Sequence, residues 1–427
     1  MKVKKSAVLF MALMLLACNR SKNVFMESFR MVVTNPLAID RHDAVVRLCI
    51  KSILKKHPDF NVNAFAVFSN GDEIPSQAVD PNQDGTADEI ITVLDLSGDE
   101  SRTLEVRYAK SGEIQLQYPK RTQAELSHKV GGRFVDRQYE GGSFQNVDFL
   151  RVPPEHTDHS WFIRYEGPGW ESDKVGYRFY LDWRNAVDIY GKKVTGMVLQ
   201  DVGQDGFESY HEMSDWGMDI LKVGESLGLG SLGMWDSEQA VRVAETDSIL
   251  CAIVENGPVY SQIRTRYFGW KVGFPSYDLI SDLSIVAGSR MTKHEVQISG
   301  PASNLCTGIV KHDSAEVLKV TGNSWEAFAT WGKQSLADDD LGMAVLYRSA
   351  DLDKITEDAH SHVIVLRPED GTLTYRFLAA WEKEPQGITS KEAFVRYLEE
   401  TIQRLESPVV IEPASDRSDI RPQERSD

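Results

Sequence analysis

Short runs of β-favouring residues, interrupted at close intervals by Asn, Asp, Gly and Pro, fill most of this chain and limit the folds open to it. Examples are "DAVVRLCI", "FNVNAFAVFS", "EIITVLDLSG" and "HVIVLRPEDGTLTYRFLAAW". Runs of this length with turn residues between them predict β-strands joined by turns. The pattern favours a mainly β fold, a large antiparallel β-sandwich with long loops.

One convincing helix is predicted near the C-terminus, from Ser390 to Leu405. Ser390 is a suitable N-cap, and the segment has an apolar face made of Phe394, Tyr397, Leu398 and Ile402. No repeat of fixed period and no interdomain linker is visible. We therefore expect a single β-sandwich domain over residues 25–406, followed by a disordered polar tail over residues 407–427.

The first residues have the pattern of a secretory signal. A basic start is followed by an apolar run, Ala7 to Leu16, which is short for a membrane span. "LLAC", ending at Cys18, resembles the lipobox of bacterial lipoproteins. We expect residues 1–17 to be a signal peptide, Cys18 to carry lipid and residues 18–24 to be a linker. Because Asn19 does not resemble the aspartate retention signal, an outer-membrane lipoprotein is favoured, with the lipid as its only membrane contact.

The charge and the cysteines narrow the partners further. A formal net charge of −17 argues against nucleic acid as a partner, because a protein surface that binds nucleic acid must be basic. Beyond Cys18, the cysteines are Cys49, Cys251 and Cys306. Three widely spaced cysteines do not suit a disulfide framework or a thiolate zinc site, so free thiols are expected.

A calcium-like loop is present at "VDPNQDGTADE", residues 79–89. Asp80, Asn82, Asp84 and Asp88 supply oxygen atoms around a turn glycine, which matches the first half of a calcium loop but lacks its final glutamate. The same residues also favour a tight turn for backbone reasons. We expect no required cofactor, with a structural Ca²⁺ as one interpretation of this loop.

Aromatic and charged residues are concentrated in "EGPGWESDKVGYRFYLDWRNAVDIYGKK", residues 166–193. Trp170 offers an apolar face for a sugar ring, and Arg178 and Arg184 offer forks that bind carboxylates. Just upstream, "HTDHSWFIRYE" adds His159. An ordinary strand with ion pairs and packed aromatics is the alternative interpretation, and for any single residue it has equal weight.

A second candidate segment is "YHEMSDWGMDILKVG", Tyr210 to Gly224. As a helix it would place four residues on one face, namely His211, Asp215, Asp219 and Lys222. Such a face usually means an ion-paired, solvated surface. Repeated glycines in this region argue against a long helix and favour a functional loop. We therefore select His211 and Tyr210 as base and acid candidates, with Trp216, Asp215 and Lys222 as substrate contacts.

Several of these segments together resemble a bacterial family known as domain of unknown function 4861. They are "EGPGWESDKVGYRFYLDWRNAVDIYGKK", "YHEMSDWGMDILKVGESLGLGSLG", "ENGPVYSQIRTRYFGW" and "TWGKQSLADDDLGMAVLY". The resemblance implies a secreted or lipid-anchored protein encoded near genes for the use of uronate-containing polysaccharides. "ENGPV…R" followed by "LSIVAGSRMTKHEVQI" also resembles the galactose-mutarotase-like supersandwich, which implies a fold but not a function. No catalytic residue is carried over from the family.

A uronate-containing oligosaccharide or polysaccharide is therefore the expected substrate, and β-elimination is the chemistry that suits these side chains. Arg264 joins Arg178 and Arg184 as a candidate carboxylate clamp, while His211, Tyr210 and His159 are candidates for proton transfer. Loss of water at a non-reducing-end uronate would make a dehydratase, and cleavage of a glycosidic bond would make a polysaccharide lyase. A glycan-binding lipoprotein, a sugar epimerase, or a glycoside hydrolase stay as alternatives; the hydrolase would draw on Glu171, Asp173, Glu212 and Asp215.

Overall fold

The computed structural model describes residues 25–273 and 275–414, and its chain divides into two compact units. Unit 1 holds residues 25–79, 87–118 and 408–414, and unit 2 holds residues 80–86 and 119–407. The sequence predicted one domain over residues 25–406, so the division into two units differs from that prediction. The predicted signal peptide, the linker to residue 24 and the lipidated Cys18 lie outside the described residues.

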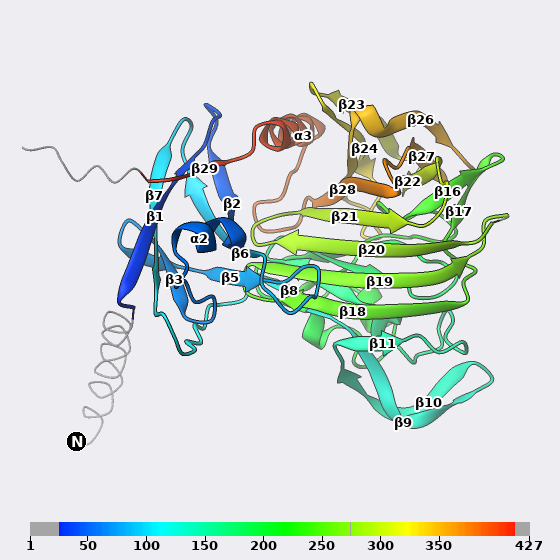
Figure 1. Ribbon diagram of the computed structural model, residues 1–427. Coiled ribbons are helices and arrows are strands. Elements are labelled where there is room, and N and C mark those ends of the chain that lie inside the picture. Colours follow the sequence, from blue (N-terminus) through cyan, green and yellow to red (C-terminus); the bar gives the residue numbers. More distant parts are fainter. Residues whose placement is uncertain (1–24, 274, 415–427) are drawn as a thin grey trace, which may run out of the picture. The chain divides into compact units, whose positions relative to one another are not determined.

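Unit 1 is a small antiparallel β structure (Figure 1). Its five-stranded sheet has the order β29 (Val410–Pro413), β1 (Glu27–Thr34), β7 (Ser101–Tyr108), β3 (Phe65–Ser69), β4 (Asp72–Ile74). Its three-stranded sheet has the order β2 (Arg41–Cys49), β6 (Glu89–Leu96), β5 (Ser76–Val79), and helix α2 (Ile50–Lys56) follows β2 directly. The apolar residues of both sheets and of α2 form one core, which includes Val33, Val46, Ile53, Ile90 and Leu104.

Two features of unit 1 differ from the sequence prediction. Helix α2 was not predicted, because its seven residues directly continue the β run of β2. Strand β29 falls within the segment predicted to be a disordered tail, and it pairs with β1 between Met31↔Pro413 and Thr34↔Val410. Backbone hydrogen bonds to an open sheet edge order this segment, and Ile411 packs against the core of unit 1. The rest of that tail, residues 415–427, is outside the described part of the chain.

Unit 2 is built on a nine-stranded sheet, and every pair of neighbouring strands in it is antiparallel. The strand order is β11 (Phe149–Arg151), β18 (Ser248–Asn256), β19 (Tyr260–Trp270), β20 (Tyr277–Val286), β21 (Met291–Ile298), β28 (Thr372–Trp381), β25 (Asp340–Arg348), β24 (Trp325–Lys333), β23 (Ala315–Thr321).

Three further sheets complete unit 2. The first has the order β15 (Gly217–Asp219), β14 (Val187–Lys192), β13 (Val175–Phe179), β12 (Gly169–Ser172), β8 (Thr122–Glu125). The second has the order β17 (Gln239–Arg242), β16 (Gly233–Asp236), β22 (Leu305–Val310), β27 (Ser361–Leu366), β26 (Leu352–Glu357). The third is a ribbon of β10 (Gln138–Asn146) and β9 (Ser127–Val135). Short 3-10 turns lie at Arg164–Glu166, Leu199–Asp201, Ser209–His211 and Ser349–Asp351.

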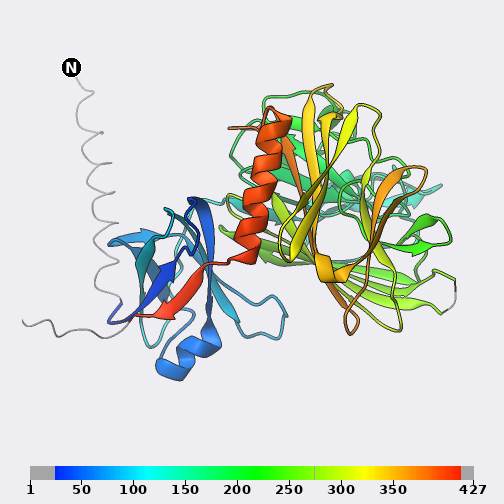
Figure 2. The ribbon, with the colours of Figure 1, turned by 90° about the horizontal axis from the view of Figure 1, so that it is seen from above.

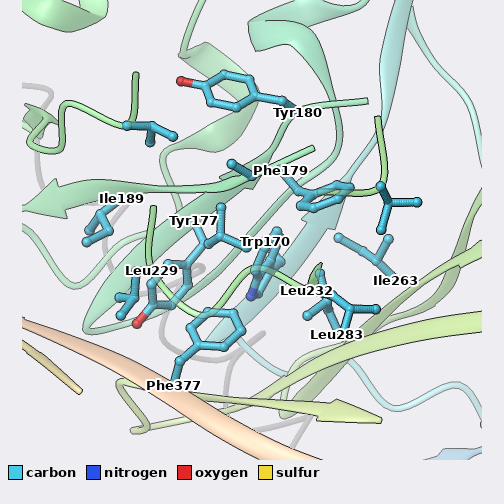
Figure 3. Packing of buried hydrophobic residues seen from close by; sticks show 14 of the residues in the cluster. Trp170, Tyr177, Phe179, Tyr180, Ile189, Leu229, Leu232, Ile263, Leu283 and Phe377 are labelled. Carbon is cyan, nitrogen blue, oxygen red and sulfur yellow. The ribbon is translucent and has the colours of Figure 1, made fainter. Parts of the chain in front are cut away.

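The sheet of β12, β13 and β14 packs face to face with the nine-stranded sheet (Figure 3). The Trp170 indole of β12 donates a hydrogen bond to Thr292 of β21 at 2.9 Å, and Tyr177 of β13 packs edge-on against Phe377 of β28. Burial of such large apolar side chains between two sheets is the main stabilising contribution to a sandwich. The predicted mainly β, antiparallel sandwich is confirmed.

The predicted C-terminal helix is also confirmed, as α3 (Lys391–Glu406). The Ser390 hydroxyl accepts a hydrogen bond from the backbone N–H of Ala393, as an N-cap does. Phe394, Leu398 and Ile402 are buried against strands β23 to β25 and β28 of unit 2 (Figure 2). No helix among the described residues is long and apolar enough to cross a bilayer.

Candidate active site

The register between β13 and β14 creates the first charged contact of the site. Successive residues of a strand face opposite sides, so Tyr177 and Phe179 enter the core while Arg178 faces away from it. Arg178 lies directly opposite Asp188 of β14, and its guanidinium donates to that carboxylate at 2.7 and 3.0 Å. Opposite charges on directly paired residues stabilise a sheet, and here both partners are buried.

Strand β15 brings a second carboxylate to Arg178. Asp219 pairs with Tyr190 of β14, and the Arg178 guanidinium donates to Asp219 at 2.5 Å. This pairing requires close backbone approach at Gly217, which has φ +134°, and a Cβ there would lie 1.8 Å from the Gly191 carbonyl oxygen. Glycine is therefore the residue that permits this strand pairing.

Tyr210 and His211 contact the same pair of residues, Arg178 and Asp219. Arg178 donates to the Tyr210 hydroxyl at 2.9 Å, and His211 Nε2 lies 3.3 Å from an Asp219 carboxylate oxygen. The His211 side chain is 43% exposed, so its ring is accessible while its partner Asp219 is buried. The hydrogen bond to Asp219 raises the pKa of His211, and burial raises the pKa of Tyr210. Both groups therefore hold their protons more firmly than they would in water.

A strained loop supplies the other half of the site. His159, Trp161, Tyr165 and Glu166 all have positive φ, between 39° and 70°. Residues other than glycine occupy this region at a cost of about 1–3 kcal/mol each, and such strain is concentrated at functional sites. The Glu166 carboxylate accepts a hydrogen bond from the backbone N–H of His159 at 2.8 Å, which helps to hold the loop in this shape.

Arg184 joins this loop to the strands. Its guanidinium lies 2.9 Å from Asp158, 2.9 Å from Glu166 and 2.5 Å from Asp182. Asp158 in turn lies 2.6 Å from His159 Nδ1, and Glu166 lies 3.8 Å from Arg178. One continuous charge network therefore joins His159 at one end to His211 at the other. Between them it passes in order through Asp158, Arg184, Glu166, Arg178 and Asp219.

The network contains more carboxylates than guanidinium groups, and the pKa values reflect this. Burial and repulsion from Asp219 raise the pKa of Asp188 to about 7, and Tyr180 donates to Asp188 at 2.5 Å. Burial also acts on Glu166, but Arg178 and Arg184 outweigh it and lower the pKa of that carboxyl. A buried group that titrates near neutral pH is typical of sites that transfer protons.

A cavity of about 490 Å³ adjoins the His159 end of the network. It is lined by Lys129, Gln138, Tyr139, Glu140, Gly141, His159, Trp161 and Phe207. The Phe207 ring lies 5.0 Å from the His159 ring, and the Phe207 backbone hydrogen-bonds to His211, so this residue contacts both histidines. A pocket with aromatic walls and a few polar groups is the usual form of a small-ligand site.

The structure brings together His159, Arg178, Arg184, Tyr210 and His211 among the residues selected from the sequence. Trp216 packs edge-on against Tyr190 beside them, at 5.9 Å between ring centroids. Asp215 and Lys222 are exposed and have no contact with the network in the described residues. The helix face expected for His211, Asp215, Asp219 and Lys222 does not form, because the segment is a short turn followed by strand β15.

The geometry corrects the roles predicted for four residues. Trp170 is fully buried in the core between sheets, so it is not a platform for sugar (Figure 3). Arg264 is paired with Asp282 at 2.8 Å and donates to the carbonyl oxygens of Pro81 and Asn82, away from the network. Arg178 and Arg184 each bind several carboxylates of the protein, so neither is a free clamp for a substrate carboxylate.

Two acids considered for hydrolysis are also occupied. Glu171 is fully buried in an ion pair with Lys192 and accepts the backbone N–H groups of Val198 and Leu199. Asp173 pairs with Arg121 at 2.5 Å. Neither carboxylate belongs to the network around Arg178.

The calcium-like loop has the geometry of a tight turn. Asp80 accepts the backbone N–H groups of Asp84 and Gly85, Asn82 also accepts from Asp84, and the Asp84 carboxylate accepts from Thr86. The carbonyl oxygens of this loop are the acceptors for Arg264. Calcium at this loop, with Asp88 as a further ligand, stays a prediction.

Sequence reasoning missed several residues of the site, and a sequence signal points to only some of them in retrospect. Asp158 and Glu166 flank His159 in the quoted segments, so acids beside a candidate histidine were visible. Lys129 and Tyr139 lie in a glycine-rich hairpin with no conspicuous motif. Asp158, His159 and Glu166 also have ligand atoms within 4.8 Å of one another, a spacing that suits a metal ion, although Arg184 already lies beside both carboxylates.

The family model described as "Domain of unknown function (DUF4861)" matches residues 33–411, so this chain belongs to that family. One similar protein is "Uncharacterized protein P7" of Formosa agariphila, which is 22% identical over 363 residues, 79% of this chain and 81% of the relative.

Solved structures with a distant likeness include an alpha-mannosidase from Enterococcus faecalis V583, at 10% identity and a TM-score of 0.41. A second is a glycosyl hydrolase family 38 protein from Enterococcus faecalis, at 9% identity and a TM-score of 0.42. The matches cover 94% and 93% of this chain, which spans about half the length of those proteins, 48% and 50%.

Proposed function

We propose that this protein is a carbon–oxygen lyase that acts by β-elimination on uronate-containing oligosaccharides. The observation that carries the proposal is the pair of histidines, His159 and His211, each held by a carboxylate at one end of a single buried network. His159 lines the aromatic cavity, and His211 contacts Phe207 of the cavity wall. Two positioned proton-transfer groups are what an elimination requires.

The reaction removes the proton on C5 of the uronate and breaks the C4–oxygen bond. The electron pair of the C5–H bond becomes the C4–C5 double bond, and the oxygen that leaves C4 takes a proton from an acid. Each well-placed acid or base contributes about 10²–10⁴-fold to the rate. One histidine as base and one as acid satisfy this balance.

We assign the acid role to His211 and the base role to His159. His211 has a raised pKa through its hydrogen bond to Asp219, so it carries its proton at a higher pH than a free histidine. Asp158 contacts Nδ1 of His159, which orients the ring and leaves Nε2 for the substrate. Tyr210 is almost fully buried and bonded to Arg178, and we assign it a positioning role.

Two products are compatible with this assignment. A hydroxyl leaving C4 of a non-reducing-end uronate would make the protein an oligosaccharide dehydratase, and a glycosidic oxygen leaving would make it a polysaccharide lyase. The same base and acid would also serve a sugar epimerase, which returns the proton to C5. A non-catalytic glycan-binding protein is supported by the aromatic lining of the cavity. Hydrolysis is the least supported, because Glu171 and Asp173 are occupied and Glu212 and Asp215 are exposed outside the network.

The test is mass spectrometry of uronate-containing oligosaccharides after incubation with the protein. His211→Ala and His159→Ala should each abolish conversion, while His42→Ala, an exposed histidine of unit 1, should leave it unchanged. Loss of one water from an intact chain means a dehydratase, and shorter products with an unsaturated end mean a lyase. Saturated fragments would move the assignment to hydrolysis, and unchanged masses across a broad panel would refute elimination.

We also propose that the protein works from the outer membrane through lipid on Cys18. The "LLAC" motif and the basic, apolar start support this placement. Cell fractionation of wild type and of Cys18→Ala tests it, because only wild type should be recovered with outer-membrane lipids. Equal recovery of both forms in the membrane fraction would contradict lipid anchoring at this residue.

A further inference from the structure

Lys129 faces inward from strand β9 while its neighbour faces water. The Lys129 residue is 9% exposed, whereas the adjacent Val130 is 41% exposed. A strand that buries a lysine and exposes a valine has the reverse of the usual polarity. The placement is set by backbone pairing, since the Lys129 N–H donates to the Phe162 carbonyl at 2.8 Å.

The Lys129 ammonium has no acidic partner among the described residues. It lies 3.6 Å from the centroid of the Trp161 ring and 5.3 Å from that of Phe144. The other buried lysine of the described chain, Lys192, has an ion pair with Glu171. Burying an unpaired charge costs free energy, and burial lowers the pKa of Lys129 accordingly. A cation–π contact recovers only part of that cost, about 0.5–2 kcal/mol.

The surroundings of Lys129 show what would satisfy it. It lines the same cavity of about 490 Å³ as His159 and Trp161, and the indole covers one side of the ammonium. Its remaining N–H donors have no acceptor from the described protein. The cavity also contains Glu140, but that residue is exposed and its cross-strand partner is Arg133. The ammonium nitrogen is open to the cavity. Water can supply acceptors there, but only an anion small enough to enter the cavity would also offset the charge.

We propose that Lys129 binds the carboxylate of the uronate ring that His159 deprotonates. The identity of the ring rests on the proposed function. Lys129 would neutralise the carboxylate of the substrate, which Arg178 and Arg184 cannot do because they bind carboxylates of the protein. A carboxylate held by an ammonium in a partly dry site accepts negative charge more readily, which makes the C5 proton more acidic. The aromatic rings of the cavity wall offer apolar faces to the sugar.

Calorimetric binding of a uronate oligosaccharide and of its carboxyl-reduced, neutral counterpart tests the assignment. Measurements are made on the full chain carrying His211→Ala, so that the ligand stays intact. Adding Lys129→Met should weaken binding of the charged ligand about 10–100-fold, the worth of a hydrogen bond to a charged group, and leave the neutral ligand unchanged. Lys129→Arg should retain part of the preference, and Lys319→Met, an exposed strand lysine, should retain all of it.

Thermal stability provides a second measurement, because Lys129→Met should weaken binding without lowering the melting temperature. Removal of an unpaired buried charge should leave Lys129→Met at least as stable to heat as wild type, as expected when a group is kept for function at the expense of stability. A lowered melting temperature, or equal loss of affinity for charged and neutral ligands, would overturn the assignment. Charge-selective binding that depends on Lys129 without any unsaturated product would refute the lyase and keep the anion site. Elimination with unimpaired charged-ligand binding in Lys129→Met would refute the anion site and keep the lyase.

Discussion

Replacing Trp170 by alanine should cost stability and leave ligand affinity intact. The Trp170 side chain is fully buried, stacks against Tyr177 at 5.5 Å and donates to Thr292. A buried tryptophan reduced to alanine costs about 3–5 kcal/mol, and the lost hydrogen bond adds about 1 kcal/mol. The sum, about 4–6 kcal/mol, is a large part of the about 5–15 kcal/mol that stabilises a typical native protein.

The assay compares Trp170→Ala and the milder Trp170→Phe with Trp161→Ala. Urea unfolding gives the stability of each protein, and calorimetry at low temperature gives the affinity for a uronate oligosaccharide. Trp161 lines the cavity and is only partly buried, so its removal should weaken binding and change stability by about 1 kcal/mol.

The opposite pattern would refute the reasoning. If Trp170→Phe unfolded at the urea concentration of wild type yet bound the ligand more weakly, Trp170 would be a ligand contact and the packing in Figure 3 would not describe its role. If Trp170→Phe and Trp161→Ala both lost affinity in proportion to their loss of stability, the cavity at Trp161 would not be the binding site.

Three further outcomes are expected. Asp219 raises the pKa of His211, so the rate should fall as pH rises through a value above the ordinary pKa of about 6.5. Asp219→Asn should move this alkaline limb of the pH–rate profile to lower pH. An unmoved limb would exclude His211 as the acid. Arg264→Met leaves Asp282 buried without its partner and should cost about 3–5 kcal/mol in urea unfolding while the folded protein keeps its turnover; lost turnover at full stability would restore Arg264 to the site. Ser390→Ala removes the N-cap of α3 and should cost about 1 kcal/mol, and an unchanged unfolding midpoint would mean that the cap contributes nothing.

Much of the site was within reach of the sequence because its residues are close along the chain. His159, Arg178, Arg184, Tyr210 and His211 all come from segments chosen for their density of charged and aromatic residues. Their partners were harder to foresee. Whether an arginine binds a substrate or a protein carboxylate depends on the acids that neighbouring strands place beside it, and composition does not record that placement.

The errors have a common physical origin. An indole suits a sugar-binding surface and a sandwich core equally well. Trp170 is buried because it lies on the face of β12 that packs against the nine-stranded sheet. In the same way, Arg264 was chosen for its side chain, but its position on β19 sets it beside Asp282. Strand β29 was included in the disordered tail because the residues that follow it are polar. Its own Val410 and Ile411 are β-branched, and the edge provided by β1 orders them.

The sequence by itself determined the local features of this protein: strands and turns, the capped helix α3, the family and the segments rich in functional side chains. These features depend on interactions over a few residues, such as alternation, turn chemistry and capping. Only the tertiary structure decided which charges are satisfied. The backbone hydrogen bond between Lys129 and Phe162 places the lysine beside the ring of Trp161. Ion pairs made by Arg184 and Arg178 join His159 and His211 in one network. Burial turns those charges into a site, because a charge removed from water must find a partner in the protein or in a ligand.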